Sequence, residues 1–211
     1  MIQGEYRIFN KNNAEKFNIR IANLDDAEKI IFVLKANLVQ VNNINELTKE
    51  KKAEIENKGF LRKEVPLQFY KKLIEDKNKE IYIASDNDDI IGFASIYKNQ
   101  NNILKIRDTS IILNIKVKKD ESILIDDDLY FIYLDQISVI PDYQHKGIAT
   151  SILNKIIQNN KDPIVSFVVN LPLKNNASDL WHTYNNFKLI GTAEGNYKNV
   201  DFLWNIYMIK K

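Results

Sequence analysis

The segment 134–158 constrains the fold of this 211-residue chain more than any other part of the sequence. An apolar run ends at Val139, a Pro-Asp turn and a short polar loop follow, and apolar residues then recur at helical spacing after Gly147. A strand, a loop and a helix N-terminus therefore succeed one another directly. The first turn of a helix has backbone N–H groups without partners and the positive end of the helix dipole, so it can receive a phosphate group. Gly147 has no Cβ to obstruct such a ligand, and Lys146 adds a positive charge.

This loop resembles motif A of the GNAT acyltransferases, whose fingerprint is Gln/Arg-x-x-Gly-x-Gly/Ala. The resemblance implies that the loop amides hold the pyrophosphate of acetyl-CoA. It assigns a cofactor-binding role to Gln144, His145, Lys146, Gly147, Ile148, Ala149 and Thr150. An ordinary strand–turn–helix joint of an α/β protein is the alternative interpretation of the same pattern.

Composition limits the classes of function. The 30 basic and 28 acidic residues nearly cancel, whereas a nucleic-acid-binding protein usually has a basic excess, so we expect no nucleic-acid partner. The chain has no cysteine, which excludes disulfides, thiolate metal sites and a cysteine nucleophile. We expect no metal. No signal-peptide pattern and no apolar run of about 18 residues, as a membrane span needs, is visible, so we expect a cytoplasmic protein without a membrane partner.

Hydrophobic periodicity predicts an ordered series of strands and helices. Strands are expected at 17–22, 80–85, 90–98, 110–118, 130–139, 164–169, 187–193 and 201–209, and helices after residue 25, at 66–74, at 147–158 and at 175–186. We expect a turn at Gly195-Asn196 to join the last two strands in a hairpin. Residues 44–58 are polar and form either an exposed helix or a mobile connection.

This order resembles the GNAT fold from about Phe17 to the C-terminus. It implies an α/β protein of mixed α+β character, with a central mixed β-sheet flanked by helices, in a single domain spanning 1–211. Residues 1–16 lie outside the match, and we expect them to form a loose N-terminal leader or an extra edge segment. Residues 99–129 form an insertion that we expect to be an extra hairpin or β-ribbon. The run Asp126–Asp128 within it is either a cation site or, in preference, a solvated turn.

A second segment resembles a later helix of the family, and it runs from Asn175 to Phe187. The resemblance implies that Asn175 and Ser178 contact the coenzyme, and that His182 stands where a tyrosine of the family often protonates the leaving thiolate. Asn175 and His182 are seven residues apart and share a helix face, whereas Tyr184 points to the opposite face. A free histidine also has the more suitable pKa, about 6.5 against about 10 for tyrosine. We expect His182 to be the acid; packing without catalysis, or protonation by Tyr184 or water, are the alternatives.

The strand 130–139 carries the other predicted site residues. The resemblance implies that backbone groups of Ile137, Ser138 and Val139 bind the pantetheine arm, at a place where two parallel strands splay apart. Asp135 is the candidate base. Together with Tyr133, it is expected to share one strand face with Ile137 and Val139. It could accept a proton from the acceptor amine, orient that amine by charge, or pair with a lysine.

Phe60 and Leu61 interrupt a polar stretch before the helix at 66–74. Because this region usually covers the acceptor in the family, they are predicted to bind substrate, with plain packing as the equal alternative.

These observations favour an N-acetyltransferase that transfers the acetyl group of acetyl-CoA to a primary amine by direct attack. The expected partner is an amine acceptor, either a small molecule or a protein, and a homodimer is left open. The alternative is a domain that binds acyl-CoA as a sensor without catalysis. A third hypothesis is an interaction protein that assembles through residues 99–129.

Overall fold

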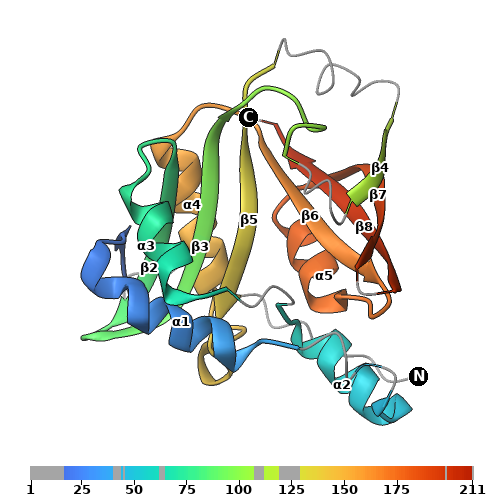
Figure 1. Cartoon of the computed structure of the whole chain (residues 1–211). Coiled ribbons are helices and arrows are strands. Elements are labelled where there is room, and N and C mark those ends of the chain that lie inside the picture. The colour runs from blue at the N-terminus through green and yellow to red at the C-terminus, as the bar shows by residue number, and fades with distance from the viewer. Residues whose placement is uncertain are drawn as a thin grey trace.

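One mixed sheet runs through the molecule. The computed structural model describes residues 17–39, 44, 46–61, 65–106, 112–118, 129–197 and 199–210. Within these residues the sheet has eight strands in the order β1-β2-β3-β5-β6-β8-β7-β4 (Figure 1). The strands are β1 Asn18–Ile21, β2 Lys79–Asp86, β3 Asp89–Gln100, β4 Ile112–Val117, β5 Phe131–Val139, β6 Ile164–Leu171, β7 Lys188–Tyr197 and β8 Val200–Ile209. The pair β5–β6 is parallel, and the other described pairs are antiparallel.

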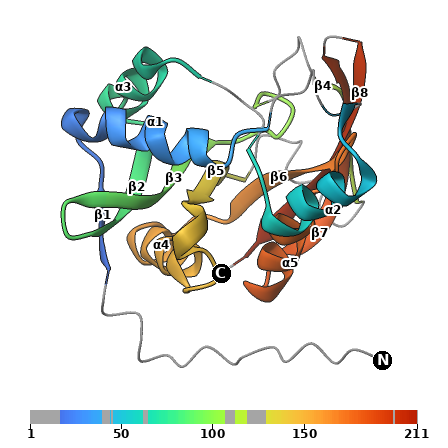
Figure 2. The ribbon, with the colours of Figure 1, turned by 90° about the horizontal axis from the view of Figure 1, so that it is seen from below.

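Helices cover both faces of this sheet. They are α1 Ala27–Ala36, α2 Lys49–Lys58, α3 Leu67–Glu75, α4 Ile148–Asn159 and α5 Asn176–Tyr184, and short 3-10 turns lie at Leu24–Asp26 and Pro141–Tyr143. Figure 2 shows α1 and α3 on one side of the sheet and α4 on the other. The predicted mixed α/β class, with a central sheet flanked by helices, is confirmed. No described helix combines the length and the apolar character needed to cross a membrane.

The two faces of the sheet have separate cores. In β2, Tyr82 and Ala84 pack toward α4, whereas Ile81 and Ile83 pack toward α1 and α3. Because side chains alternate along a strand, a strand that is buried on both faces shows a continuous apolar run. The buried residues of α4, Ile148, Ile152, Leu153 and Ile156, follow the helical period predicted from the sequence.

The strand expected near 110–118 exists as β4, but its position differs from the prediction. It pairs antiparallel with β7 and extends the edge of the main sheet, and in the described residues it forms no separate hairpin. Gly191 permits this approach, because a Cβ on Gly191 would overlap the carbonyl oxygen of Lys116. Residues 1–16 and the run Asp126–Asp128 lie outside the described residues.

Two further predictions have clear outcomes. Residues 49–58 form the helix α2, which has no buried residue. Of the two alternatives for this polar stretch, the exposed helix is therefore confirmed over these residues. The hairpin turn predicted at Gly195-Asn196 is wrong. Those residues continue β7 and pair with Phe202 and Asp201, and the chain reverses between Tyr197 and Val200. Asn199 there has a φ of 60°, a conformation that asparagine tolerates better than most residues.

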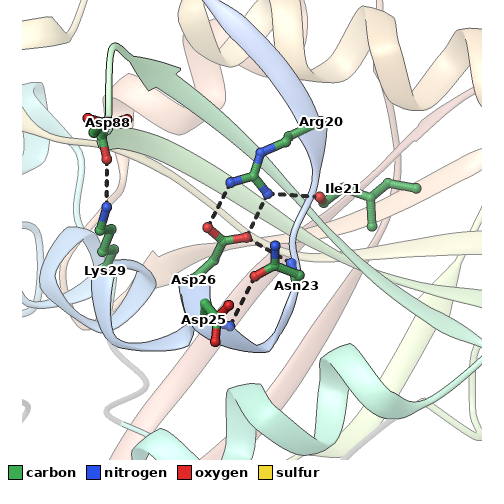
Figure 3. A network of polar contacts seen from close by, with 7 residues as sticks. All are labelled: Arg20, Ile21, Asn23, Asp25, Asp26, Lys29 and Asp88. Carbon is green, nitrogen blue, oxygen red and sulfur yellow. Dashed lines mark hydrogen bonds and ion pairs between the residues drawn. The ribbon is translucent and has the colours of Figure 1, made fainter.

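A polar network fixes the entry into α1 (Figure 3). The guanidinium of Arg20 donates to both carboxylate oxygens of Asp26, at 2.6 and 2.8 Å. The backbone N–H of Asn23 also donates to Asp26, and the side chain of Asn23 accepts from the N–H of Asp25. The Arg20 hydrogen bonds lower the pKa of Asp26. At the next turn Lys29 donates to the carbonyl of Asp88, at 2.7 Å, so both contacts anchor the start of α1.

Candidate active site

The two central strands separate in the middle of the sheet. The parallel pairing of β5 with β6 covers only Ile132–Leu134 against Ile164–Ser166. Beyond Leu134, β5 remains paired with β3 alone within the described residues, and Figure 1 shows β5 and β6 diverging there. The predicted splay is therefore present, and we call the separated region the β5–β6 opening.

Backbone polar groups of β5 face this opening. The backbone N–H of Ile140 donates to the carbonyl oxygen of Ile91 in β3, and the N···O distance is 2.9 Å. Backbone groups alternate in direction along a strand, so the polar groups of Ile137 and Val139 point away from β3, into the opening. Those of Ser138 point toward β3. Of the three residues predicted to bind the pantetheine arm, Ile137 and Val139 thus present their backbone to the opening.

A β-bulge at Asp135 changes which side chains share a face. Ser95 pairs with Gln136 and Ile96 pairs with Leu134, so Asp135 is an extra residue in β5. After a bulge the alternation of side chains shifts by one position. The expectation that Asp135 shares one face with Ile137 and Val139 is therefore wrong.

The side chains on either side of the bulge confirm this shift. Ile137 and Val139 pack in the core under α4. Tyr133 lies on the opposite face, where its ring contacts Tyr97 at 5.8 Å between centroids. Asp135 lies on the same face as Tyr133, since its charge raises the pKa values of Tyr70, Tyr97 and Tyr133.

The surroundings of Asp135 are rich in tyrosine hydroxyls. Burial, and then the charge of Asp135, raise the pKa values of Tyr70, Tyr97 and Tyr133 well above the ordinary value. A hydrogen bond between Tyr133 and Asp135 adds to this effect. The hydroxyl of Tyr70 donates to Gln136 Oε1 at 2.7 Å, inside the protein. Asp135 itself is half-buried, so one carboxylate lies at the edge of the opening among neutral hydroxyl groups.

The predicted phosphate loop leads from this strand into α4. Gly147 is the N-cap of α4 with a φ of 81°, and no atom lies within 4 Å of the place where its Cβ would be. His145 also has a left-handed backbone, with a φ of 60°, and the side chains of both His145 and Lys146 are exposed. Lys146 Nζ lies 4.5 Å from the ring centroid of Tyr143. The first turn of α4 is thus open to an anion, with a cation beside it.

Other residues of the motif hold the loop in place. The amide of Gln144 donates to Val139 O at 3.2 Å and to Asn37 Oδ1 at 3.1 Å. Thr150 Oγ1 accepts a hydrogen bond from Trp181 Nε1 at 3.2 Å, which ties α4 to α5. Ile148 is buried and packs in the core, whereas Ala149 is half-buried. The side chains of Gln144, Ile148 and Thr150 thus have structural partners, and their backbone amides belong to the loop and the first turn of α4.

Asn37 is a site residue that the sequence did not reveal. It follows the last turn of α1, and its Nδ2 donates to Ser138 Oγ and to Val139 O, each at 2.9 Å. Together with Gln144 it closes a polar clamp on the end of β5, which we call the Asn37 clamp. An asparagine after a helix is common at a C-terminus, so nothing local distinguishes this one. Its partners lie 101 and 102 residues away in the chain.

The helix α5 places the predicted acid in the core. His182 is 1% exposed, whereas Tyr184 is 73% exposed, which confirms that the two residues lie on opposite faces. His182 Nδ1 lies 2.7 Å from the carbonyl oxygen of Ser178, and Nε2 lies 3.1 Å from Ser166 Oγ. Because a carbonyl only accepts, Nδ1 carries the proton and Nε2 accepts from the serine hydroxyl. Burial lowers the pKa of His182 to about 4.

This environment favours a structural role for His182 over the predicted role as acid. The neutral ring commits its one N–H to a backbone carbonyl, and the protonated form is scarce near neutral pH. Asn175, the N-cap of α5, is also fully engaged, since its Oδ1 accepts from the N–H of Ser178 and its Nδ2 donates to the carbonyl of Phe60. Ser178 Oγ lies 3.4 Å from His182 Nδ1. The side chains of α5 that were predicted to contact the coenzyme thus already have hydrogen-bond partners within the protein.

The residues predicted to line an acceptor pocket pack against the protein. Phe60 is 6% exposed and lies in a core with Val169 and Leu173. Leu61 pairs with Leu38 in an isolated parallel bridge and packs against the core under α1 and α3. Packing, the alternative considered for these residues, accounts for both.

Comparison with known proteins agrees with this geometry. The sequence model of the Acetyltransferase (GNAT) family matches residues 41–163. No curated protein sequence matches the chain. Among solved structures, the chain is similar to Arabidopsis thaliana NAA60 in complex with acetyl-CoA, with 14% identity, a TM-score of 0.58, and coverage of 92% of this chain and 97% of that chain.

Two further structures have the same fold. The PaiA N-acetyltransferase from Thermoplasma acidophilum in complex with coenzyme A has 16% identity and a TM-score of 0.51, over 90% of this chain and 97% of that chain. An N-acetyltransferase from Staphylococcus aureus Mu50 has 16% identity and a TM-score of 0.53, over 92% and 98%. At such identities the likeness shows the fold alone. The family match spans more than half of the sequence, and with the splayed strands and the loop at Gly147 it leads to one conclusion: the chain belongs to the GNAT acetyltransferase family.

Proposed function

We propose that the chain is an N-acetyltransferase that moves the acetyl group of acetyl-CoA onto a primary amine. The observation that carries the proposal is the β5–β6 opening, which leads to the open first turn of α4 at Gly147. The structures from Arabidopsis thaliana and Thermoplasma acidophilum were obtained with acetyl-CoA and coenzyme A, which supports the same ligand here.

Each part of the coenzyme has a proposed place in this arrangement. The pyrophosphate lies against the backbone amides of residues 145–150, because an open helix N-terminus favours negative charge. Lys146 contributes an exposed cation beside it. The pantetheine arm lies along β5, where its amides pair with the backbone groups of Ile137 and with the N–H of Val139. The carbonyl oxygen of Val139 already accepts from the clamp. The Asn37 clamp holds that end of β5 in position.

The reaction is direct transfer. The amine nitrogen, once neutral, attacks the carbonyl carbon of the thioester, a C–N bond forms, and the C–S bond breaks to release the thiolate of coenzyme A. The amine gives up a proton and the thiolate takes one, so the exchange balances without a protein nucleophile. We assign to Asp135 the orientation of the ammonium group and the acceptance of its proton, directly or through water. We assign the protonation of the thiolate to water, since His182 is buried with its one N–H committed.

The test is the release of free thiol from acetyl-CoA in the presence of a panel of primary amines. Thiol release that depends on the amine supports the proposal. Asp135→Asn should reduce kcat by roughly 10²- to 10⁴-fold if the carboxylate takes the proton. If Asp135 only orients the ammonium, KM for the amine should rise instead.

A second candidate function is an acyl-CoA sensor without catalysis. The observation that favours it is the burial of His182, which removes the side chain predicted to be the acid. Binding of acetyl-CoA without thiol release for any amine of the panel would support the sensor and contradict the enzyme.

A further inference from the structure

Four aromatic side chains form a row across the middle of the sheet. Tyr97 of β3, Tyr133 of β5 and Phe167 of β6 lie in ring contact, with centroids 5.8 and 5.7 Å apart. Trp204 of β8 continues this line, because it pairs with Val169, which lies on the same face of β6 as Phe167. All four side chains are half-buried. We call these residues the aromatic row.

The row lies on the sheet face that carries α1 and α3, between two buried clusters. Val165 and Ile206 belong to a core on one side of it, and Val169 and Phe202 belong to a core on the other side. Trp204 contacts both cores and stacks on Phe202 at 5.2 Å between centroids. In Figure 1 no described helix crosses in front of the central parts of β5 and β6. Because its four members are half-buried, part of the row remains exposed between the two packed cores.

One carboxylate, that of Asp135, stands beside the row at Tyr133, next to the opening. The bulge places Asp135 on the face of Tyr133, and the two residues are hydrogen-bonded. Among the positions of β3, β5, β6 and β8 that face the same way, Asp135 is the one acidic side chain in the described residues. The ring of Tyr97 already lies near a cation, since Lys79 Nζ is 5.3 Å from its centroid. An ammonium group at this point therefore meets both a carboxylate and aromatic rings, which attract cations.

From this arrangement we infer that the aromatic row is the floor of the acceptor site, and that it selects a primary arylalkylamine, with one positive charge and a flat apolar body. The inference rests on the proposed function and specifies its acceptor. The amine nitrogen lies beside Asp135, next to the β5–β6 opening, where a thioester carbonyl along β5 would be within reach. The aromatic body lies on Phe167 and Trp204, where ring contacts and the loss of water stabilise it. A polyamine bound in the same way would place its further charges on the rings of Phe167 and Trp204, and no acidic side chain of β6 or β8 faces that part of the row in the described residues.

The experiment compares three probes in the thiol-release assay: phenethylamine, n-butylamine and spermidine. We expect kcat/KM to be at least about tenfold higher for phenethylamine than for n-butylamine, since the burial of a ring contributes about 1.4 kcal/mol or more. Spermidine should be the poorest acceptor. Equal kcat/KM values for phenethylamine and n-butylamine, or a preference for spermidine, would overturn the inference.

Variants of the row separate ring recognition from general damage. Phe167→Leu keeps an apolar side chain but removes the ring, so it should raise KM for phenethylamine by roughly tenfold and leave that for n-butylamine nearly unchanged. Tyr184→Leu is the matched control, because Tyr184 is an exposed aromatic residue away from the row. If Phe167→Leu changes both acceptors equally, or if Tyr184→Leu has the same effect, the row does not select the ring.

Direct binding separates failure of this inference from failure of the proposed function. Phenethylamine can be titrated calorimetrically into the protein saturated with coenzyme A. Binding that is lost in Phe167→Leu, without thiol release, would uphold the acceptor floor and contradict catalysis. Thiol release with n-butylamine or spermidine, but neither binding nor turnover of phenethylamine, would uphold catalysis and contradict the floor. If the protein neither binds phenethylamine nor turns over any of the three amines, the acceptor floor is contradicted, and the full amine panel decides whether the proposed function fails as well.

Discussion

Protonation of His182 should destabilise the protein at mildly acid pH. Burial lowers the pKa of His182 to about 4, whereas the unfolded chain has the ordinary value of about 6.5. Between these two values the unfolded state binds more protons than the folded state, so stability falls as the pH falls. At pH 5.0 most unfolded chains carry the proton and most folded chains do not. By linkage, the loss between pH 7.5 and pH 5.0 is about 2 kcal/mol, and it approaches about 3 kcal/mol below pH 4.

The assay is urea unfolding of the wild type and of His182→Gln at both pH values. Glutamine keeps a polar group of similar size and does not titrate. The difference in unfolding free energy between the two proteins should shrink by about 2 kcal/mol from pH 7.5 to pH 5.0, because the other titrating groups cancel in the difference. Thr183→Gln, on the exposed side of α5, is the control for the substitution itself. A difference that does not depend on pH would refute the conclusion that burial keeps this histidine neutral.

Three further predictions concern other parts of the structure. Asn37→Ala should raise KM for acetyl-CoA several-fold with a smaller change in kcat, because it removes the clamp on Val139 and no reacting group. Steady-state kinetics measures both constants, and an unchanged KM would argue against a positioning role. Gly191→Ala should destabilise the fold by about 1–3 kcal/mol, because the new Cβ overlaps the backbone of β4; urea unfolding measures this, and a neutral result would mean that β4 is not held against β7. Arg20→Met should reduce the acid sensitivity of unfolding by less than about 1 kcal/mol. The Arg20 hydrogen bonds lower the pKa of Asp26, so their stabilisation is present above pH 4 and is lost as the pH falls through the folded value; an unchanged pH profile would contradict this.

The sequence predicts those features of the fold that depend on local pattern. The strand–loop–helix around Gly147 is local, because the apolar period, the turn residues and the glycine all fall within one short segment. The splay of β5 from β6 was expected from the family resemblance, and the buried face of α4 was expected from helical spacing.

Features that depend on register or on distant partners were not predictable in the same way. The bulge at Asp135 arises from the pairing of β5 with β3, and one extra residue reverses the faces of all side chains beyond it. The burial of His182 in α5 depends on contacts with Ser166 of β6 and Tyr207 of β8, which are distant in the sequence. The end of the last hairpin was misplaced because Asn199 supplies the left-handed conformation that the sequence suggested for Gly195.

The central claim is that acetyl-CoA binds at the first turn of α4, beside the β5–β6 opening. Isothermal titration calorimetry of acetyl-CoA against the wild type, Gly147→Glu and Asn154→Glu tests it most directly. Gly147→Glu places a bulky negative side chain in the open space at the helix N-terminus, so it should abolish binding. Asn154→Glu adds the same charge at an exposed position further along α4, so it should leave binding nearly unchanged. Tight binding to folded Gly147→Glu, or no binding to the wild type, would contradict the account.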